Sequence, residues 1–341
     1  MPLPLFIAIG AGVAATVGAA AGIHGAVKMK EANDTVKLAD RCHKRNIKKF
    51  EEQSGVTTKS MDDLGKLELE ILHSFKKFSD TLEKIQNRPQ FDKILTENVD
   101  LPKYSPEELD KVSVGAGVLL GGLSGAAIGT AGGFAAAGAT TSAVMALGTA
   151  STGTAIASLS GVAATNATLA ALGGGAIAAG GGGMALGSMV LGGATLGVGI
   201  LVGGVIFSVT GSKISDKADE AWRQMRKAEE IIKIICTYLA ELNDTACQYA
   251  NTLLQAQKKY EQNFDVMFSV VNDLGIQDWN QFSPEAKRAT KNAVLLVGLL
   301  FKMCKVKLVK KAEQKDAMNE INEVEITESL QEAEQVFENV N

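Results

Sequence analysis

One block of the chain, residues 112–211, contains no aspartate, glutamate, lysine, arginine or histidine. It also contains 27 of the 36 glycines of the 341-residue chain. A domain exposed to water needs polar groups on the outer face of each element, whereas a helix in lipid does not. The block therefore predicts membrane-spanning helices, and at about 20 to 25 residues per span it has room for two or four crossings.

Within this block, five glycines recur at intervals of four residues, which places them on one face of a helix. Lipid enforces the helix, and a groove of glycines lets neighbouring backbones approach closely. We interpret this zipper as a helix-packing or pore-lining surface, to which Asn166 adds the one amide of the small-residue stretch 140–171. The zipper residues are Gly117, Gly121, Gly125, Gly129 and Gly133.

Residues 3–27 are apolar and rich in small side chains, and Lys28 and Lys30 follow them directly. This pattern predicts a first transmembrane helix, with its basic end in the cytoplasm. Lys111 and Lys213 flank the long block, so both of its ends are also predicted to be cytoplasmic.

The sequence thus predicts an all-α membrane protein of the bacterial inner membrane. It would combine a glycine-rich transmembrane helical bundle with a helical cytosolic domain. We divide the chain into a first transmembrane helix (1–27), a first cytosolic part (28–111), the glycine-zipper channel domain (112–211), a second cytosolic part (212–315) and an acidic tail (316–341).

In the cytosolic parts, apolar residues between Met61 and Ile85 recur every three or four positions, which predicts an amphipathic helix ending at Arg88-Pro89. A similar pattern over residues 215–271 predicts a long helix with a kink or a break. Ser105-Pro106 and Ser283-Pro284 each predict the start of a further helix. No strand pattern is present, and the tail is expected to be a loosely packed helix or disordered.

Chemical motifs point away from an enzyme, because the sequence has no phosphate-binding loop, no nucleophile elbow and no HExxH motif. The four cysteines show no metal-binding spacing and are interpreted as free thiols. We expect no cofactor and no metal.

Two clusters of cations are candidate nucleic-acid contacts, since a polyanion binds where positive charges gather on one face. The alternative interpretation is a solvated helix face, or pairing with the acidic tail. The first cluster contains Arg41, Lys44, Arg45 and Lys48, and the second contains Lys302, Lys305 and Lys310. Trp279, Tyr260 and Phe282 are candidates for base stacking, against the alternative of core aromatics.

Residues 11–33 and the glycine runs of residues 172–185 resemble bacterial glycine-zipper membrane proteins. The layout of the whole chain is similar to the membrane effector of Hailong antiphage defence systems. That resemblance implies an ion channel with a cytosolic crown, held closed by a single-stranded DNA oligomer that a partner nucleotidyltransferase makes. No DNA-binding motif of the family can be placed residue by residue here, so the basic clusters rest on charge alone.

The functional hypothesis is a homo-oligomeric channel, for instance a tetramer, that is gated by an oligonucleotide and arrests growth when it opens. A ligand closes such a channel only by favouring its closed state. A pore-forming toxin and a non-conducting membrane scaffold are the alternatives.

Overall fold

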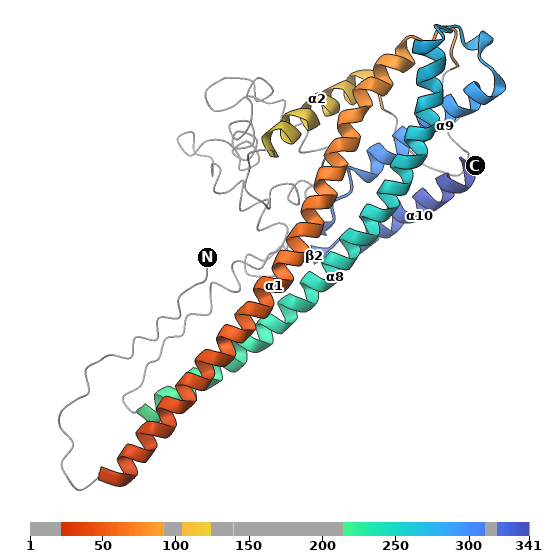
Figure 1. Cartoon of the computed structure of the whole chain (residues 1–341). Coiled ribbons are helices and arrows are strands. Elements are labelled where there is room, and N and C mark those ends of the chain that lie inside the picture. The colour runs from red at the N-terminus through yellow and green to blue at the C-terminus, as the bar shows by residue number, and fades with distance from the viewer. Residues whose placement is uncertain are drawn as a thin grey trace, which may run out of the picture. The chain divides into compact units, whose positions relative to one another are not determined.

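The computed structural model of the protein describes residues 22–89, 91, 104–123, 139, 214–310 and 319–340 (Figure 1). The chain divides into two compact units. The first unit contains residues 22–57 and 214–241 of the described chain, and the second contains its other described residues. Each unit is described by itself below.

Helices make up most of the described chain. Helix α1 spans Gly22–Glu83 and helix α8 spans Ile214–Phe268, and each contributes its first part to the first unit and the rest to the second. The other elements are α2 (Pro106–Leu123), the π-helix η4 (Ser269–Asp273), the 3-10 helix η5 (Trp279–Gln281), α9 (Pro284–Met303), β1 (Val309–Lys310), β2 (Glu320–Ile321) and α10 (Glu323–Asn339).

Helices α1 and α8 bury residues that recur every seven positions, which is the pattern of a coiled-coil seam. Each helix has two such series, and their positions together form its buried stripe. On α8 the series are Ala218, Met225, Ile232 and Leu239, and Ala221, Ala228, Ile235 and Leu242. On α1 they are Thr57, Leu64, Ile71 and Phe78, and Met61, Glu68, Phe75 and Leu82.

Within the second unit, α1 and α8 run in the same direction. The Ser60 hydroxyl donates to the Asn243 side chain over 2.7 Å, and further along both helices the Lys84 ammonium donates to Asn272 over 2.6 Å. In the first unit, the Thr57 hydroxyl donates to the Leu239 carbonyl over 2.8 Å. Parallel neighbours cannot be joined by a tight turn, and here residues 84–213 connect them.

The core of the second unit is built around α9. All of residues 293–301 are buried, as expected for a helix that is apolar on every side. Helix α10 packs against α9 and buries Ile326, Ala333 and Val336. Phe75 of α1 meets Tyr260 of α8 edge to face, with 6.4 Å between ring centroids.

Several local predictions are confirmed. The Ser105 hydroxyl accepts from the Glu108 amide over 3.1 Å at the start of α2, and the Ser283 hydroxyl accepts from the Ala286 amide over 3.1 Å at the start of α9. Helix α1 ends at Glu83, shortly before Arg88-Pro89. The four cysteines are free.

Other local predictions are wrong. Helix α8 is continuous over 55 residues, and only at its end does the chain pass into the π-helix η4. A short antiparallel pair, with Val309 opposite Ile321, was not expected. The pair escapes a pattern search because each strand has only two residues.

The membrane prediction is also wrong. Among the described residues, no helix combines the length and the apolar character needed to cross a bilayer. This finding contradicts the predicted all-α membrane fold with its transmembrane helical bundle, the channel assignment and the inner-membrane localisation. Helix α2 carries Glu107, Glu108, Asp110 and Lys111 in its first turns. The apolar part that the structure describes, residues 112–123, extends about 18 Å, against about 30 Å of hydrocarbon.

The predicted first span up to residue 21, and the long block beyond residue 123 apart from Ala139, lie outside the described residues. So do Gly125, Gly129, Gly133 and Asn166. The two zipper glycines that the structure describes, Gly117 and Gly121, lie on α2. Gly117 lies beside His73 of α1, so there the absent side chain makes room for a ring rather than for a second zipper helix.

These two glycines provide a matched pair of substitutions. A Cβ at Gly117 would lie 2.9 Å from the His73 ring, whose Nδ1 is 3.2 Å from the Ser113 carbonyl oxygen, whereas a Cβ at Gly121 meets nothing within 4 Å. We expect Gly121→Ala to raise the free energy of unfolding by about 1 kcal/mol through helix propensity. Gly117→Ala should lower it by about 1 kcal/mol because the ring must move. Urea denaturation measures both, and equal effects would contradict the His73 packing.

Candidate nucleic-acid interface

The first basic cluster forms a row along α1 in the first unit. We call Lys37, Arg41, Lys44, Arg45 and Lys48 the α1 basic stripe, and all five side chains are exposed. Lys37, Arg41, Lys44 and Lys48 follow one another at intervals of three or four residues, and Arg45 lies four residues after Arg41, so the five side chains share one face of the helix. That face is opposite to Ala39 and Asn46, which are buried. The row extends about 16 Å at 1.5 Å per residue.

Acidic residues neutralise this stripe only in part. Lys44 pairs with Asp40 at 2.8 Å and Lys48 pairs with Glu52 at 3.6 Å. Both partners lie four residues away on α1 itself, and the two lysine side chains are 70% and 76% exposed. Such surface pairs contribute about 0–1 kcal/mol and yield readily to a stronger anion. In the described part of the chain, no carboxylate of another helix pairs with the stripe.

The second basic cluster lies in the second unit, and its members have different surroundings. Lys302 of α9 pairs with Glu332 of α10 at 2.6 Å, and both side chains are more than half buried. Lys305 lies 3.6 Å from the Glu108 carboxylate and 4.0 Å from the centre of the Phe301 ring. Lys310 is an exposed residue of β1. Two of the three cations therefore already have anionic partners from other elements.

The aromatic candidates for base stacking are core residues. Tyr260 is 2% exposed, Phe282 is 4% exposed and Trp279 is 9% exposed. Trp279 packs against Phe282, with 5.4 Å between ring centroids. None of the three presents a free ring face to a nucleic acid, so contacts at the α1 basic stripe would be made to phosphates rather than to bases.

A buried polar cluster in the second unit was not predicted. Glu68 occupies a seam position of α1, is completely buried, and accepts no hydrogen bond with either carboxylate oxygen. Burial raises the pKa of its carboxyl well above the usual value. The Cys304 thiol donates to the Glu68 main-chain oxygen over 3.9 Å, and burial, reinforced by the Glu68 charge, raises the pKa of that thiol.

Tyr249 of α8 completes this cluster. Its hydroxyl donates to the Met303 carbonyl over 2.9 Å and lies 3.0 Å from the Ser329 hydroxyl of α10. Burial raises the pKa of Tyr249, and the negative charges of Glu68 and Glu332 act in the same direction. The seven-residue spacing from Met61 to Glu68 to Phe75 was the signal in the sequence, because it places a carboxylate in an apolar seam.

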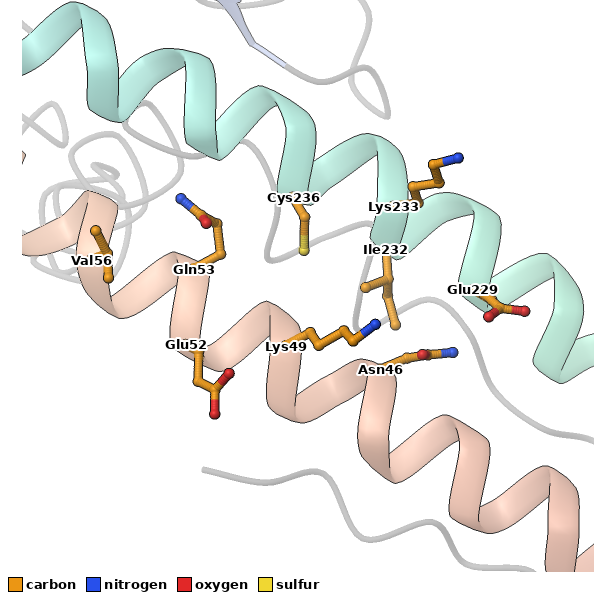
Figure 2. Close-up of a pocket in the computed structure, with 9 residues that line it drawn as sticks. All are labelled: Asn46, Lys49, Glu52, Gln53, Val56, Glu229, Ile232, Lys233 and Cys236. Carbon is orange, nitrogen blue, oxygen red and sulfur yellow. The ribbon is translucent and has the colours of Figure 1, made fainter.

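A pocket of about 460 Å³ between α1 and α8 in the first unit was also missed. We call it the α1–α8 pocket. In Figure 2 the ammonium end of Lys49 extends toward the side chain of Asn46, and the Cys236 thiol points into the pocket. Ile232 and Val56 supply apolar lining. Its residues come from positions more than 170 apart in the chain, so no local pattern marks it.

Within the part of the chain that the structure describes, no group of three histidine, cysteine, aspartate or glutamate side chains is placed to hold a metal ion. The arrangements that remain are therefore the exposed cations of α1, the buried carboxylate cluster and the α1–α8 pocket. Comparison with protein-family models, curated proteins and solved structures finds no match for this chain.

Proposed function

We propose that this protein is an oligonucleotide-binding helical protein, not an enzyme, and that the α1 basic stripe is its contact with single-stranded DNA. The observation that carries the proposal is the row of five exposed cations whose ion pairs with other described residues are weak ones within α1. Binding a polyanion to such a row releases condensed counterions, which supplies most of the affinity of a non-specific complex.

The geometry of the stripe favours contacts to the DNA backbone. Its length of about 16 Å matches a few successive phosphates, which lie about 3.4 Å apart along one stacked strand. Because Tyr260, Trp279 and Phe282 are buried, these three rings are not available for base stacking, and the sequence preference should be weak. We therefore expect a salt-sensitive complex with little discrimination between base sequences.

For the biological setting, we propose what the sequence resemblance implies about antiphage defence and leave out the ion channel. An effector of antiphage defence would be held inactive by the bound oligonucleotide, which must then bind the inactive state more tightly than the active one. The partner nucleotidyltransferase, the homo-oligomer and the growth arrest stay predictions. Each requires its own test in cells.

Fluorescence anisotropy with a labelled single-stranded DNA of about 20 nucleotides tests the proposal directly. We expect binding whose logarithmic affinity falls linearly with the logarithm of the salt concentration, with a slope of about −3 to −4, because four or five phosphates are contacted. A duplex of the same sequence is the comparison. No binding at about 50 mM salt, or a slope near zero, would refute the interface.

A further inference from the structure

The α1–α8 pocket contains a buried hydrogen-bond donor without an acceptor. Asn46 is only 5% exposed, and among the described residues its side-chain nitrogen has no hydrogen-bond partner. An unpaired buried amide is costly, so such groups usually serve a ligand or a water molecule. Asn46 and Lys49 both line the pocket, and in Figure 2 the Lys49 side chain extends toward the side chain of Asn46.

The charges around the pocket leave a positive excess. Of the two carboxylates in its lining, Glu52 pairs with Lys48 at 3.6 Å and Glu229 pairs with Arg226 at 3.6 Å. Neither Lys48 nor Arg226 lines the pocket, so both carboxylates are matched by cations outside it. The two lysines of the lining, Lys49 and Lys233, have no ion pair among the described residues. An anion is the ligand that this balance favours.

The rest of the lining sets the size and character of that anion. Ile232 and Val56 are apolar, and Val56 lies ten residues along α1 from Asn46, or about 15 Å. A volume of about 460 Å³ falls in the range of roughly 300–1,000 Å³ that is usual for small-molecule sites. The pocket thus offers a cationic, hydrogen-bonding end and an apolar wall, which suits a phosphate attached to a less polar group.

We propose that the α1–α8 pocket binds a small phosphate monoester, with the Lys49 ammonium and the Asn46 amide donating to its phosphate oxygens. Charge-assisted bonds of this kind are the stronger class of hydrogen bond in proteins. The ester group lies along Ile232 and Val56. None of the five residues of the α1 basic stripe lines this pocket, although Lys48 pairs with Glu52 of its lining, so binding of a small ligand and binding of single-stranded DNA are measured separately.

The reactivity of the Cys236 thiol reports whether a ligand occupies the α1–α8 pocket. This thiol is half-buried in the pocket, where burial raises its pKa and the charge of Lys49 acts in the opposite direction. The thiolate is the reactive form, so a ligand that covers the thiol and neutralises Lys49 slows its modification. The full chain carrying Cys42→Ser and Cys247→Ser isolates this signal, since the one other thiol, Cys304, is completely buried.

The experiment measures the rate at which a chromogenic disulfide labels Cys236 in this background. Adenosine 5′-monophosphate is the phosphate monoester, adenosine and inorganic phosphate are its two parts, and potassium chloride matches the ionic strength. We expect the monophosphate to slow labelling severalfold at saturation, inorganic phosphate to do so only at higher concentration, and adenosine and chloride to have no effect. Equal protection by adenosine or by chloride would overturn the proposal. Equal protection by inorganic phosphate would reduce the site to one for free phosphate.

Three variants assign the effect to the pocket. Lys49→Ala should raise the concentration of monophosphate that gives half protection by about tenfold, because it removes a bond to a charged ligand. Asn46→Asp should raise it by at least as much, because the aspartate loses the amide donor and also repels the phosphate. Lys227→Ala is the control, since Lys227 is an exposed residue of α8 in the same unit that does not line the pocket. If both variants reached half protection of Cys236 at the same monophosphate concentration as the protein without these substitutions, the assignment to this pocket would be refuted. Circular dichroism verifies that each variant is folded.

Discussion

Replacing Arg41, Lys44, Arg45 and Lys48 together by alanine is expected to weaken the binding of single-stranded DNA by roughly 10²–10³-fold at about 0.1 M salt. The magnitude follows from counterion release, since each neutralised phosphate of a single strand contributes about 0.7 to the salt slope. The slope itself should become less steep by about 3. Anisotropy titrations of the labelled strand at several salt concentrations give both quantities.

The stability of the protein should change little in this variant. Alanine is the strongest helix former, and the two intrahelical pairs that are lost, Lys44 with Asp40 and Lys48 with Glu52, contribute about 0.3–0.5 kcal/mol each. Loss of binding would therefore report the interface and not unfolding. Far-ultraviolet circular dichroism checks this.

A matched control separates the stripe from the net charge of the first unit. Arg223, Arg226, Lys227 and Lys233 are four exposed cations of α8 in the same unit, so their replacement by alanine changes the charge by the same amount. Glu220, Glu229 and Glu230 lie among them, and two of these acids pair with Arg223 and Arg226. We expect this variant to lose far less affinity. Equal losses in the two variants would mean that net charge, and not the α1 basic stripe, attracts the DNA.

A Glu68→Met variant is expected to be more stable than the wild type at pH 8, by about 1–4 kcal/mol, because it replaces a buried ionisable group by an apolar one of similar volume. The Glu68 carboxylate has no hydrogen-bond partner among the described residues and is completely buried, so its ionisation in the folded state is not compensated. Urea denaturation at pH 5 and at pH 8 measures the difference in the free energy of unfolding.

The pH dependence has a definite sign. Burial raises the folded-state pKa of Glu68 well above its usual value of 4.5, so the folded state retains a proton that the unfolded chain has lost. The destabilisation is absent below that usual value, grows as the pH rises above it, and is complete above the folded pKa. Wild-type stability should therefore fall between pH 5 and pH 8 by more than that of Glu68→Met. An equal fall in both proteins would show that Glu68 is not the responsible group.

Glu68→Gln distinguishes charge from polarity at this position. The amide has the shape of the carboxyl but does not ionise, so this variant should lose the excess pH dependence while gaining less stability than Glu68→Met. We expect the buried carboxylate to fix the register of the pairing of α1 with its neighbours, as polar residues in coiled-coil seams do. In that case, Glu68→Met should show broader amide resonances or a less cooperative transition despite its stability.

The starts and ends of helices could be predicted from the sequence, because they depend on neighbouring residues. Ser105 and Ser283 cap α2 and α9 through amides three residues away, and such a contact needs no tertiary information. Periodicity gave the apolar face of α1 between Met61 and Ile85 for the same reason. The exposed row of the α1 basic stripe also follows from spacing, since it lies opposite to the buried face.

The membrane assignment is wrong for the helices that the structure describes. The apolar character of residues 112–211 suggested a bilayer span entered by way of α2, but no described helix is both long and apolar enough to cross a bilayer, and the first turns of α2 carry four charged residues. The second basic cluster shows a similar limit. Its charges are evident in the sequence, but the pairing of Lys302 with Glu332 joins residues 30 positions apart.

The sequence by itself determined the local features of this protein: its helical character, its helix caps, its free thiols and the row of cations on α1. Only the tertiary structure decided which helix faces meet, because contacts between distant segments leave no periodic mark in either one. The parallel packing of α1 with α8 places Glu68 in an apolar seam, and in the first unit it brings Asn46, Lys49 and Cys236 to one pocket. Their burial and their partners come from residues far away in the chain, and those surroundings set their chemistry.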